Sequence, residues 1–206
     1  MSERMSLDRT TPVPVYIGLG ANLDDPRQQV ERALSELQAL PQSRLAAISR
    51  RYRTAPVGPK DQPDFVNAVA RVDTLLDPMT LLALLQRIER RHGRIRNGRR
   101  WGPRTLDLDV LLFGDQVLDE PRLCIPHPQM HSRAFVLVPL ADIASAELMV
   151  PGRGRLGDLL DQVAEAAQTM LPLQVAAEDE PAAAEPDAAE PDAAEPDAPL
   201  KRASLP

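Results

Sequence analysis

Two segments of the chain begin with the same short sequence, an aspartate followed by a proline. Asp25-Pro26 and Asp77-Pro78 each precede a run in which apolar side chains recur at helical spacing. Aspartate accepts hydrogen bonds from the free N–H groups at a helix start, and proline suits the first turn because no N–H is needed there. We therefore predict helices over 26–40 and from Pro78 onward, capped by Asp24 or Asp25 and by Asp77. Their apolar positions are Val30, Ala33, Leu34 and Leu37 in the first helix and Leu81, Leu84, Leu85 and Ile88 in the second.

Runs typical of β-strands surround these two helices. They are rich in β-branched and other apolar residues, and loops containing proline and glycine separate them. The resulting order, strand-helix-strand-strand-helix-strand, is typical of an α+β ferredoxin-like βαββαβ sandwich, an antiparallel sheet covered by helices on one face. The predicted strands are 13–20, 45–52, 65–72 and 106–113, with a hairpin partner at 116–118; further helical segments are predicted before 143 and over 156–167.

The C-terminal part of the chain has a composition of its own. Residues 178–198 repeat Ala-Glu-Pro-Asp-Ala, which places a proline every fifth residue and offers no apolar side chain larger than alanine. Proline at that spacing stops a helix, and a segment without large apolar side chains cannot build a core. We predict a flexible N-terminal arm over 1–12, one domain over 13–172 and a disordered acidic tail over 173–206.

The net charge of -6 comes from this tail. From Glu178 onward nine acidic residues face two basic ones, a balance of -7, so the preceding residues carry 22 basic and 21 acidic groups, or +1. The body is thus near neutral, unlike a typical nucleic-acid-binding domain.

Cysteine content and hydropathy point to the cytoplasm. The single cysteine, Cys124, allows no disulfide within the chain, and no apolar run reaches the length of a membrane span. No apolar stretch typical of a secretory signal precedes Val13. We expect a cytoplasmic protein that does not bind a membrane, and we expect a monomer.

The strand predicted over 106–113, LDLDVLLF, carries two aspartates. Alternate side chains of a strand share a face, so Asp107 and Asp109 should point together while Leu106, Leu108, Val110 and Leu112 enter the core. Aspartate is disfavoured in strands, and two carboxylates at this separation can hold a hard cation such as Mg²⁺ with water and phosphate completing its ligands. We predict a metal site; the alternative is a solvated polar face of the strand.

Arginine and glycine dominate the residues just before this strand. Guanidinium groups bind phosphate in a two-pronged geometry and stay charged at every working pH. We predict a loop that closes over a phosphate group; the alternatives are a solvated arginine-rich loop and a nucleic-acid-binding module that uses Trp101. The arginines of this loop are Arg94, Arg96, Arg99, Arg100 and Arg104.

Two phenylalanines lie outside any clear core pattern. Phe65 follows a proline-rich loop and Phe135 lies in the segment HSRAF. Taken alone, each is expected in the core; taken together, their rings could sandwich a flat heterocycle, with the amide of Asn67 at its edge. His127 and His131 are four residues apart, but the prolines on both sides of His127 prevent a regular helix, so we reject a zinc site.

Four blocks of sequence, in order across residues 14–145, resemble the 6-hydroxymethyl-7,8-dihydropterin pyrophosphokinase family of folate biosynthesis. The blocks are YIGLGANL, YRTAPVGPKDQPDFVNAV, LLQRIERRHGRIRNGRRWGPRTLDLDVLLFG and IPHPQMHSRAFVLVPLADIA. The resemblance implies transfer of the β,γ-diphosphate of ATP to the pterin hydroxymethyl group, with release of AMP. It also implies two Mg²⁺ ions, ATP as co-substrate and small-molecule partners, whereas the alternative from the residues alone is the nucleic-acid-binding module.

The resemblance assigns a role to individual residues, and it moves both phenylalanines from the core to the site. The catalytic residues it implies are Arg94, Arg104, Asp107 and Asp109, of which Asp107 and Asp109 would bind the metal. The ATP-binding residues it implies are Gln86, Glu89, Arg96, Trp101, Arg122, His127 and Arg133. The pterin-binding residues it implies are Thr54, Ala55, Val57, Phe65, Asn67 and Phe135.

Overall fold

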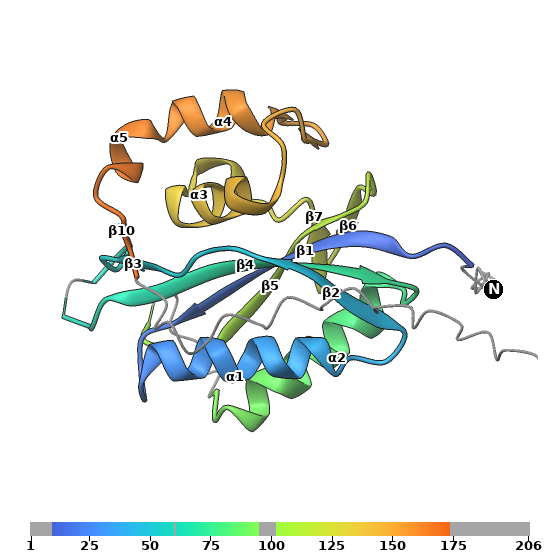
Figure 1. The fold of residues 1–206 in the computed structure, drawn as a ribbon, viewed down its shortest axis with the longest axis horizontal. Helices are drawn as coiled ribbons and strands as arrows, with labels where there is room; N and C mark the ends of the chain where they lie inside the picture. Colours follow the sequence, from blue (N-terminus) through green and yellow to red (C-terminus); the bar gives the residue numbers. More distant parts are fainter. Residues whose placement is uncertain (1–9, 60, 95–101, 174–206) are drawn as a thin grey trace, which may run out of the picture. The chain divides into compact units, whose positions relative to one another are not determined.

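A central antiparallel sheet organises the protein in the computed structural model, which describes residues 10–59, 61–94 and 102–173. The strand order is β10-β3-β4-β1-β5, and β2 also pairs with β4 (Figure 1). The predicted α+β class with an antiparallel sheet is therefore confirmed. The strands of this sheet are β1 (Val13–Ala21), β2 (Ser43–Ile48), β3 (Tyr52–Thr54), β4 (Phe65–Thr74), β5 (Asp107–Phe113) and β10 (Leu171–Pro172).

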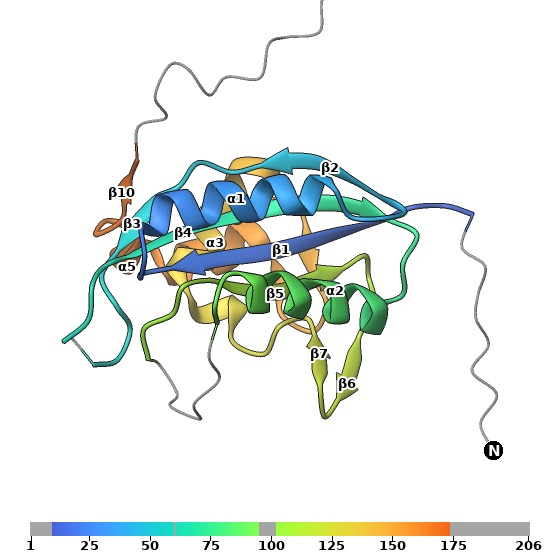
Figure 2. The ribbon, with the colours of Figure 1, turned by 90° about the horizontal axis from the view of Figure 1, so that it is seen from below.

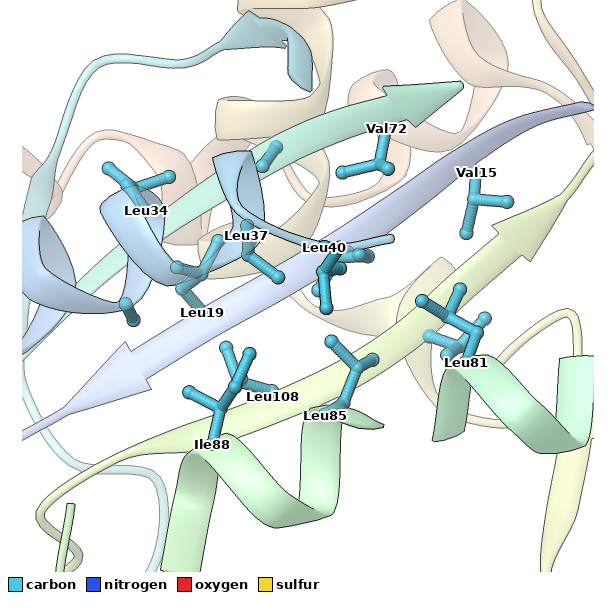
Figure 3. Close-up of a cluster of buried hydrophobic side chains, with 14 of the residues drawn as sticks. Val15, Leu19, Leu34, Leu37, Leu40, Val72, Leu81, Leu85, Ile88 and Leu108 are labelled. Atoms are coloured by element: carbon cyan, nitrogen blue, oxygen red, sulfur yellow. The ribbon is translucent and has the colours of Figure 1, made fainter. Parts of the chain in front are cut away.

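Helices α1 (Pro26–Gln38) and α2 (Pro78–Arg91) begin where the Asp-Pro sequences predict. Asp25 Oδ1 accepts a hydrogen bond from the Gln28 N–H at 3.2 Å. Asp77 Oδ1 accepts from the Met79 and Thr80 N–H groups, at 3.0 Å each. Both helices lie on the same face of the sheet (Figures 1 and 2). Figure 3 shows their apolar side chains directed at those of β1 and β5, with Leu34 and Leu37 from α1 and Leu81, Leu85 and Ile88 from α2.

The opposite face of the sheet is also covered, which corrects the prediction of helices on one face only. Helices α3 (Ala134–Ile143), α4 (Leu156–Gln162) and α5 (Ala164–Ala167) lie there (Figure 1). The predicted final helix over 156–167 is in fact two short helices, because the backbone at Val163 leaves helical geometry with φ -110° and ψ 10°. A second core cluster forms on this face from Tyr16, Val69, Leu111, Leu112, Leu137, Leu140, Leu156 and Leu159.

The predicted strand over 45–52 is two strands, β2 and β3, separated at Ser49. The Ser49 N–H donates to the Val69 carbonyl at 2.9 Å, and the Val69 N–H donates to Ser49 Oγ at 2.8 Å. A side-chain oxygen thus replaces the backbone oxygen that a regular ladder would use. The apolar pattern of the segment does not reveal this change of hydrogen-bond acceptor.

The predicted hairpin partner of β5 is wrong. Residues Leu118–Glu120 form β6 and pair with β7 (Leu123–Ile125) instead. On the outer edge of β5, the Leu111 carbonyl accepts a hydrogen bond from the His127 N–H at 2.9 Å. The chain after β7 therefore returns to β5 and brings His127 beside it. The remaining short elements are η1 (Met130–Ser132), β8 (Met149–Val150) and β9 (Gly154–Arg155).

A bulge in β5 changes the face of one predicted core residue. Tyr16 pairs with Leu112 and Ile17 pairs with Val110, which leaves Leu111 as an extra residue. Leu106, Leu108 and Val110 enter the core beneath α1 and α2 as predicted, whereas Leu112 joins the cluster on the α3 face.

Most of the predicted N-terminal arm lies outside the described residues. So does all of the predicted acidic tail except its first residue, Leu173. Both stay predictions. In the described ranges, no helix has the length and apolar content that crossing a membrane requires.

Candidate active site

The candidate site lies at the C-terminal end of β1, between its two neighbouring strands. Gly20 is paired with Asn67 of β4 on one side and with Asp107 of β5 on the other. A Cβ atom at Gly20 would lie 3.1 Å from Asn67 Oδ1, so the missing side chain keeps the floor of the site open. A pocket on the α3 side of the sheet is lined by Gly18, Gly20, Thr54, Ala55, Val57, Phe65, Asn67, Val69, Arg104, Asp107, Asp109, Leu111, His127, Arg133, Phe135 and Val136, among others.

All six residues predicted to bind the pterin line this pocket. Asn67 Nδ2 donates to Thr54 Oγ1 at 2.8 Å, and both side chains are buried. Phe65 and Phe135 remain partly exposed on the pocket wall, as the resemblance predicts and in contrast to the core positions expected from the residues alone. Phe65 and Asn67 of β4 and Phe135 of α3 thus form one wall of the pocket, the aromatic wall.

The two aspartates of β5 have different surroundings. Asp107 forms ion pairs with both Arg94 and Arg104. Burial alone would raise the pKa of Asp107, but the two guanidinium groups outweigh it and hold that pKa below its usual value. At Asp109, desolvation and the negative charge of Asp107 raise the pKa. Its side chain stays 45% exposed, so water in the pocket moderates this rise.

His127 faces Asp109 as a neutral imidazole. Burial, aided by the positive charge of Arg133, lowers the pKa of His127 to about 4. The Gln129 N–H donates to His127 Nδ1 at 3.2 Å, which assigns the ring proton to Nε2. Nε2 lies 4.0 Å from Asp109 Oδ2 and can donate a hydrogen bond to an anionic oxygen in the pocket.

Arg133 completes this end of the pocket. Its guanidinium carbon lies 5.5 Å from the centroid of the Phe135 ring, and its side chain also bonds to Gln129. Arg133 thus lines the same pocket as the aromatic wall and the aspartate pair, and its guanidinium can bind a phosphate group there.

Glu89 of α2 is hydrogen-bonded to β5, the strand that carries the two aspartates. It is only 2% exposed and is not among the pocket-lining residues. Its Oε1 accepts from the Leu108 N–H at 3.0 Å and is ion-paired with Arg94. Because Leu108 lies between the two aspartates, Glu89 fixes the strand that presents them and holds the start of the arginine loop.

The other residues predicted to bind ATP are spread more widely. His127 and Arg133 line the pocket, whereas Gln86 on α2 and Arg122 between β6 and β7 do not. Arg96 and Trp101 lie outside the described residues.

The donor set at β5 fits magnesium carried with a nucleotide. In the ranges that the structure describes, no group of three or more His, Cys, Asp or Glu side chains could hold a metal ion by itself. Mg²⁺ is commonly bound by one or two carboxylates together with substrate phosphates, and Asp107 with Asp109 provides that number. A cation between them would also offset the repulsion that raises the pKa of Asp109.

Sequence reasoning missed several pocket residues. Gly18 and Gly20 are two residues apart in a strand, so they share one face of it. This spacing indicates a strand face without side chains, which can form the floor of a pocket. Leu111, Val69 and Val136 gave no such signal, because an apolar residue lining a pocket has the same pattern as one in a core.

Comparison with known proteins places the chain in a family. Residues 16–145 match the family model described as 7,8-dihydro-6-hydroxymethylpterin-pyrophosphokinase (HPPK). A 2-amino-4-hydroxy-6-hydroxymethyldihydropteridine pyrophosphokinase from Pseudomonas aeruginosa is 55% identical over 146 residues, which cover 71% of this chain and 89% of that protein. The enzyme of the same name from Haemophilus influenzae is 48% identical over 153 residues, covering 74% and 94%.

Solved structures share the fold at low identity. A Plasmodium falciparum HPPK-DHPS with pterin and p-hydroxybenzoate superposes with a TM-score of 0.62 at 16% identity, covering 82% of this chain and 46% of that one. An HPPK-DHPS in complex with substrates gives a TM-score of 0.61 at 12% identity, covering 81% and 47%. This chain thus spans about half the length of those proteins. The sequence match and the shared fold together show that the chain belongs to the 7,8-dihydro-6-hydroxymethylpterin-pyrophosphokinase family.

Proposed function

We propose that this protein transfers the β,γ-diphosphate of ATP to the hydroxymethyl group of 6-hydroxymethyl-7,8-dihydropterin, giving the pterin diphosphate and AMP in folate biosynthesis. One observation carries the proposal: a slot for a flat heterocycle and a pair of carboxylates flanked by arginines open into the same pocket. The family and its named relatives support the same reaction. Nothing in these comparisons supports the nucleic-acid alternative.

The pterin is held by the aromatic wall. Phe65 and Phe135 offer ring faces, and Asn67, fixed by Thr54, offers an amide to the edge of the heterocycle. Ala55 and Val57 would add backbone groups from the loop that follows β3. Such a slot orients the hydroxymethyl group toward Asp107 and Asp109, and positioning of this kind is the main contribution that phosphoryl transfer needs from a protein.

The phosphates of ATP are held at the other end of the pocket. Asp107 and Asp109 would bind two Mg²⁺ ions, which neutralise charge and align the attacking and leaving oxygens when bound. Arg94 and Arg104, which pair with Asp107 in the structure, would offer their guanidinium groups to phosphate oxygens. His127 donates from Nε2, and Arg133 offers a further guanidinium. We assign no side chain as a general base.

Product analysis tests the reaction. The purified protein is incubated with Mg-ATP, with and without the reduced pterin, and the nucleotide product is identified by chromatography. We expect AMP only when pterin is present, and its loss when Asp107 or Asp109 is replaced by alanine. ADP would contradict the reaction class, and absence of turnover by the folded protein would favour the nucleic-acid module, whose binding should weaken steeply with salt.

We also propose that magnesium is required and that the protein acts as a cytoplasmic monomer. Chelation of divalent ions should abolish AMP formation, and added Mg²⁺ should restore it. Sedimentation of the full chain at several concentrations tests the monomer, which a concentration-dependent mass would contradict.

A further inference from the structure

Asn22 is the residue that follows the last residue of β1, and its side chain contacts two segments far apart in sequence. It is 1% exposed and is not among the pocket-lining residues. Its Nδ2 donates to Gln62 Oε1 and to the Pro63 carbonyl, at 3.1 Å each. Its Oδ1 accepts from the Arg104 N–H at 2.8 Å, and its own N–H donates to the Arg104 carbonyl at 3.0 Å.

These two segments lead to the two ends of the pocket. Pro63 lies two residues before Phe65 of the aromatic wall, and Arg104 lies three residues before Asp107. Regular pairing of β1 ends at Ala21 with β4 and at Gly20 with β5. Asn22 therefore continues the connection between the two sides beyond the last pairs of the sheet.

We propose that Asn22 is a positioning residue that sets the spacing between the pterin-binding and the phosphate-binding ends of the pocket; the proposal rests on the function proposed above. Asparagine suits this place because its amide donates two hydrogen bonds while its carbonyl accepts one. Aspartate would keep the acceptor for Arg104 and lose both donors. Alanine would lose all three side-chain bonds and leave the Arg104 N–H and the Pro63 carbonyl without them.

Gln62 connects Asn22 to the loop that follows β3 and contains Val57. Its Oε1 accepts from Asn22, and its Nε2 donates to the Pro59 carbonyl at 2.9 Å. The loop that contains Val57 is thus tied through Gln62 to the end of β1. A change at Gln62 should disturb the pterin side of the pocket and leave Arg104 in place.

Steady-state kinetics with each substrate varied in turn test the proposal, with thermal unfolding measured in parallel. For Asn22→Asp and for Gln62→Ala we expect the KM for pterin to rise about tenfold, as the loss of a buried hydrogen bond would produce, with the KM for ATP unchanged. Asn22→Ala should raise both KM values and lower kcat. Gln62→Glu keeps the acceptor for Asn22 but loses the donor to the Pro59 carbonyl, so the KM for pterin should rise less than in Gln62→Ala.

The alternative is a purely structural role, in which the variants lower the thermal midpoint and the amount of active enzyme but leave both KM values unchanged. That result, or an equal rise of both KM values in Gln62→Ala, overturns the proposal. If Asn22→Asp does not fold, the result for Gln62→Ala alone decides the test.

Phe135→Ala in the same assay separates the Asn22 proposal from the proposed function of the pocket. If it leaves the pterin KM unchanged, the pocket assignment fails and the Asn22 proposal fails with it. If it raises that KM while Gln62→Ala does not, only the Asn22 proposal fails.

Discussion

The face of the sheet beneath α1 and α2 is closed, whereas the face beneath α3 opens into a pocket at one end. On the closed face, leucine, valine and isoleucine side chains fill the space between helices and strands (Figure 3). A buried His92 there contacts Gln29 Oε1 at 2.6 Å and Glu36 Oε1 at 2.8 Å, so the polar groups have partners. On the open face, two aromatic rings remain partly exposed and Asp109 has no close cationic partner among the described residues.

The difference between the two faces shows how one sheet separates stability from chemistry. Apolar packing and satisfied polar groups lower the free energy of the folded state, and the closed face has both. Groups that keep binding capacity for a substrate must remain incompletely satisfied, and such groups are placed together on the open face. Substitutions on the closed face should therefore change the free energy of unfolding, and substitutions of the polar pocket residues on the open face should change turnover.

The largest effect is expected at the aspartate pair. Replacing Asp109 by Asn removes the charge that holds a cation and should lower turnover about a thousandfold, since charge stabilisation of phosphoryl transfer would be lost. The same change relieves repulsion with Asp107, so the thermal midpoint should stay equal or rise. The exposed Asp115→Asn, in the turn after the same strand, is the matched control and should leave both quantities unchanged. Normal turnover of Asp109→Asn would exclude a metal-binding role for this residue.

On the closed face, Leu37→Ala should act on stability alone. Leu37 is fully buried between α1 and the sheet, and truncating such a leucine costs about 2–5 kcal/mol of unfolding free energy. Chemical denaturation measures this loss, and turnover per folded molecule should match that of the parent protein. A fall in turnover of the folded variant would show that the two faces are coupled more closely than their packing indicates.

Glu89 belongs to α2 on the closed face but is bonded to Leu108 and Arg94 beside the aspartates, so it should sharpen the comparison. Glu89→Gln keeps an acceptor for the Leu108 N–H but removes the charge paired with Arg94, so we expect kcat to fall about tenfold with the KM for ATP unchanged. The exposed Glu165→Gln serves as control. A selective rise in the KM for ATP would instead show direct contact with the nucleotide, the role that the family resemblance implies.

The smallest effect concerns pH. Burial would raise the pKa of Glu36, but its bonds to Arg91 and His92 outweigh burial and lower that pKa below the usual 4.5. A lowered pKa in the folded state means that the stabilisation is present above about pH 4.5 and is lost as the pH falls further. Glu36→Gln should therefore reduce the loss of stability between neutral and acid pH by less than about 1 kcal/mol, because the pair is partly exposed. Parallel pH profiles of the two proteins measure this, and identical profiles would contradict it.

Local chemistry made part of the fold predictable. Asp25 and Asp77 mark both helix starts because capping needs only the residues next to it. The break at Ser49 and the bulge at Leu111 escaped prediction, since each depends on a partner in another strand. Helical segments before 143 and over 156–167 were predicted, but their position on the second face of the sheet was not, because the predicted strand and helix order already described a complete sandwich.

The candidate site was predictable where a sequence block carries it. The shared face of Asp107 and Asp109 follows from strand alternation, and the six pocket residues predicted to bind the pterin follow from the family resemblance. Asn22 was missed because an asparagine after Gly-Ala is typical of a turn. Its partners Gln62 and Arg104 are 40 and 82 residues away, so only the folded chain brings them together.

The most direct test of the central claim follows the terminal phosphates of ATP in a single turnover. ATP labelled in the γ-phosphate is mixed with excess protein, Mg²⁺ and 6-hydroxymethyl-7,8-dihydropterin, and the products are separated. We predict that the label appears in the pterin diphosphate while the nucleotide becomes AMP, because both ends of the pocket act on one substrate pair. Label released as inorganic phosphate together with ADP would contradict diphosphate transfer in this pocket.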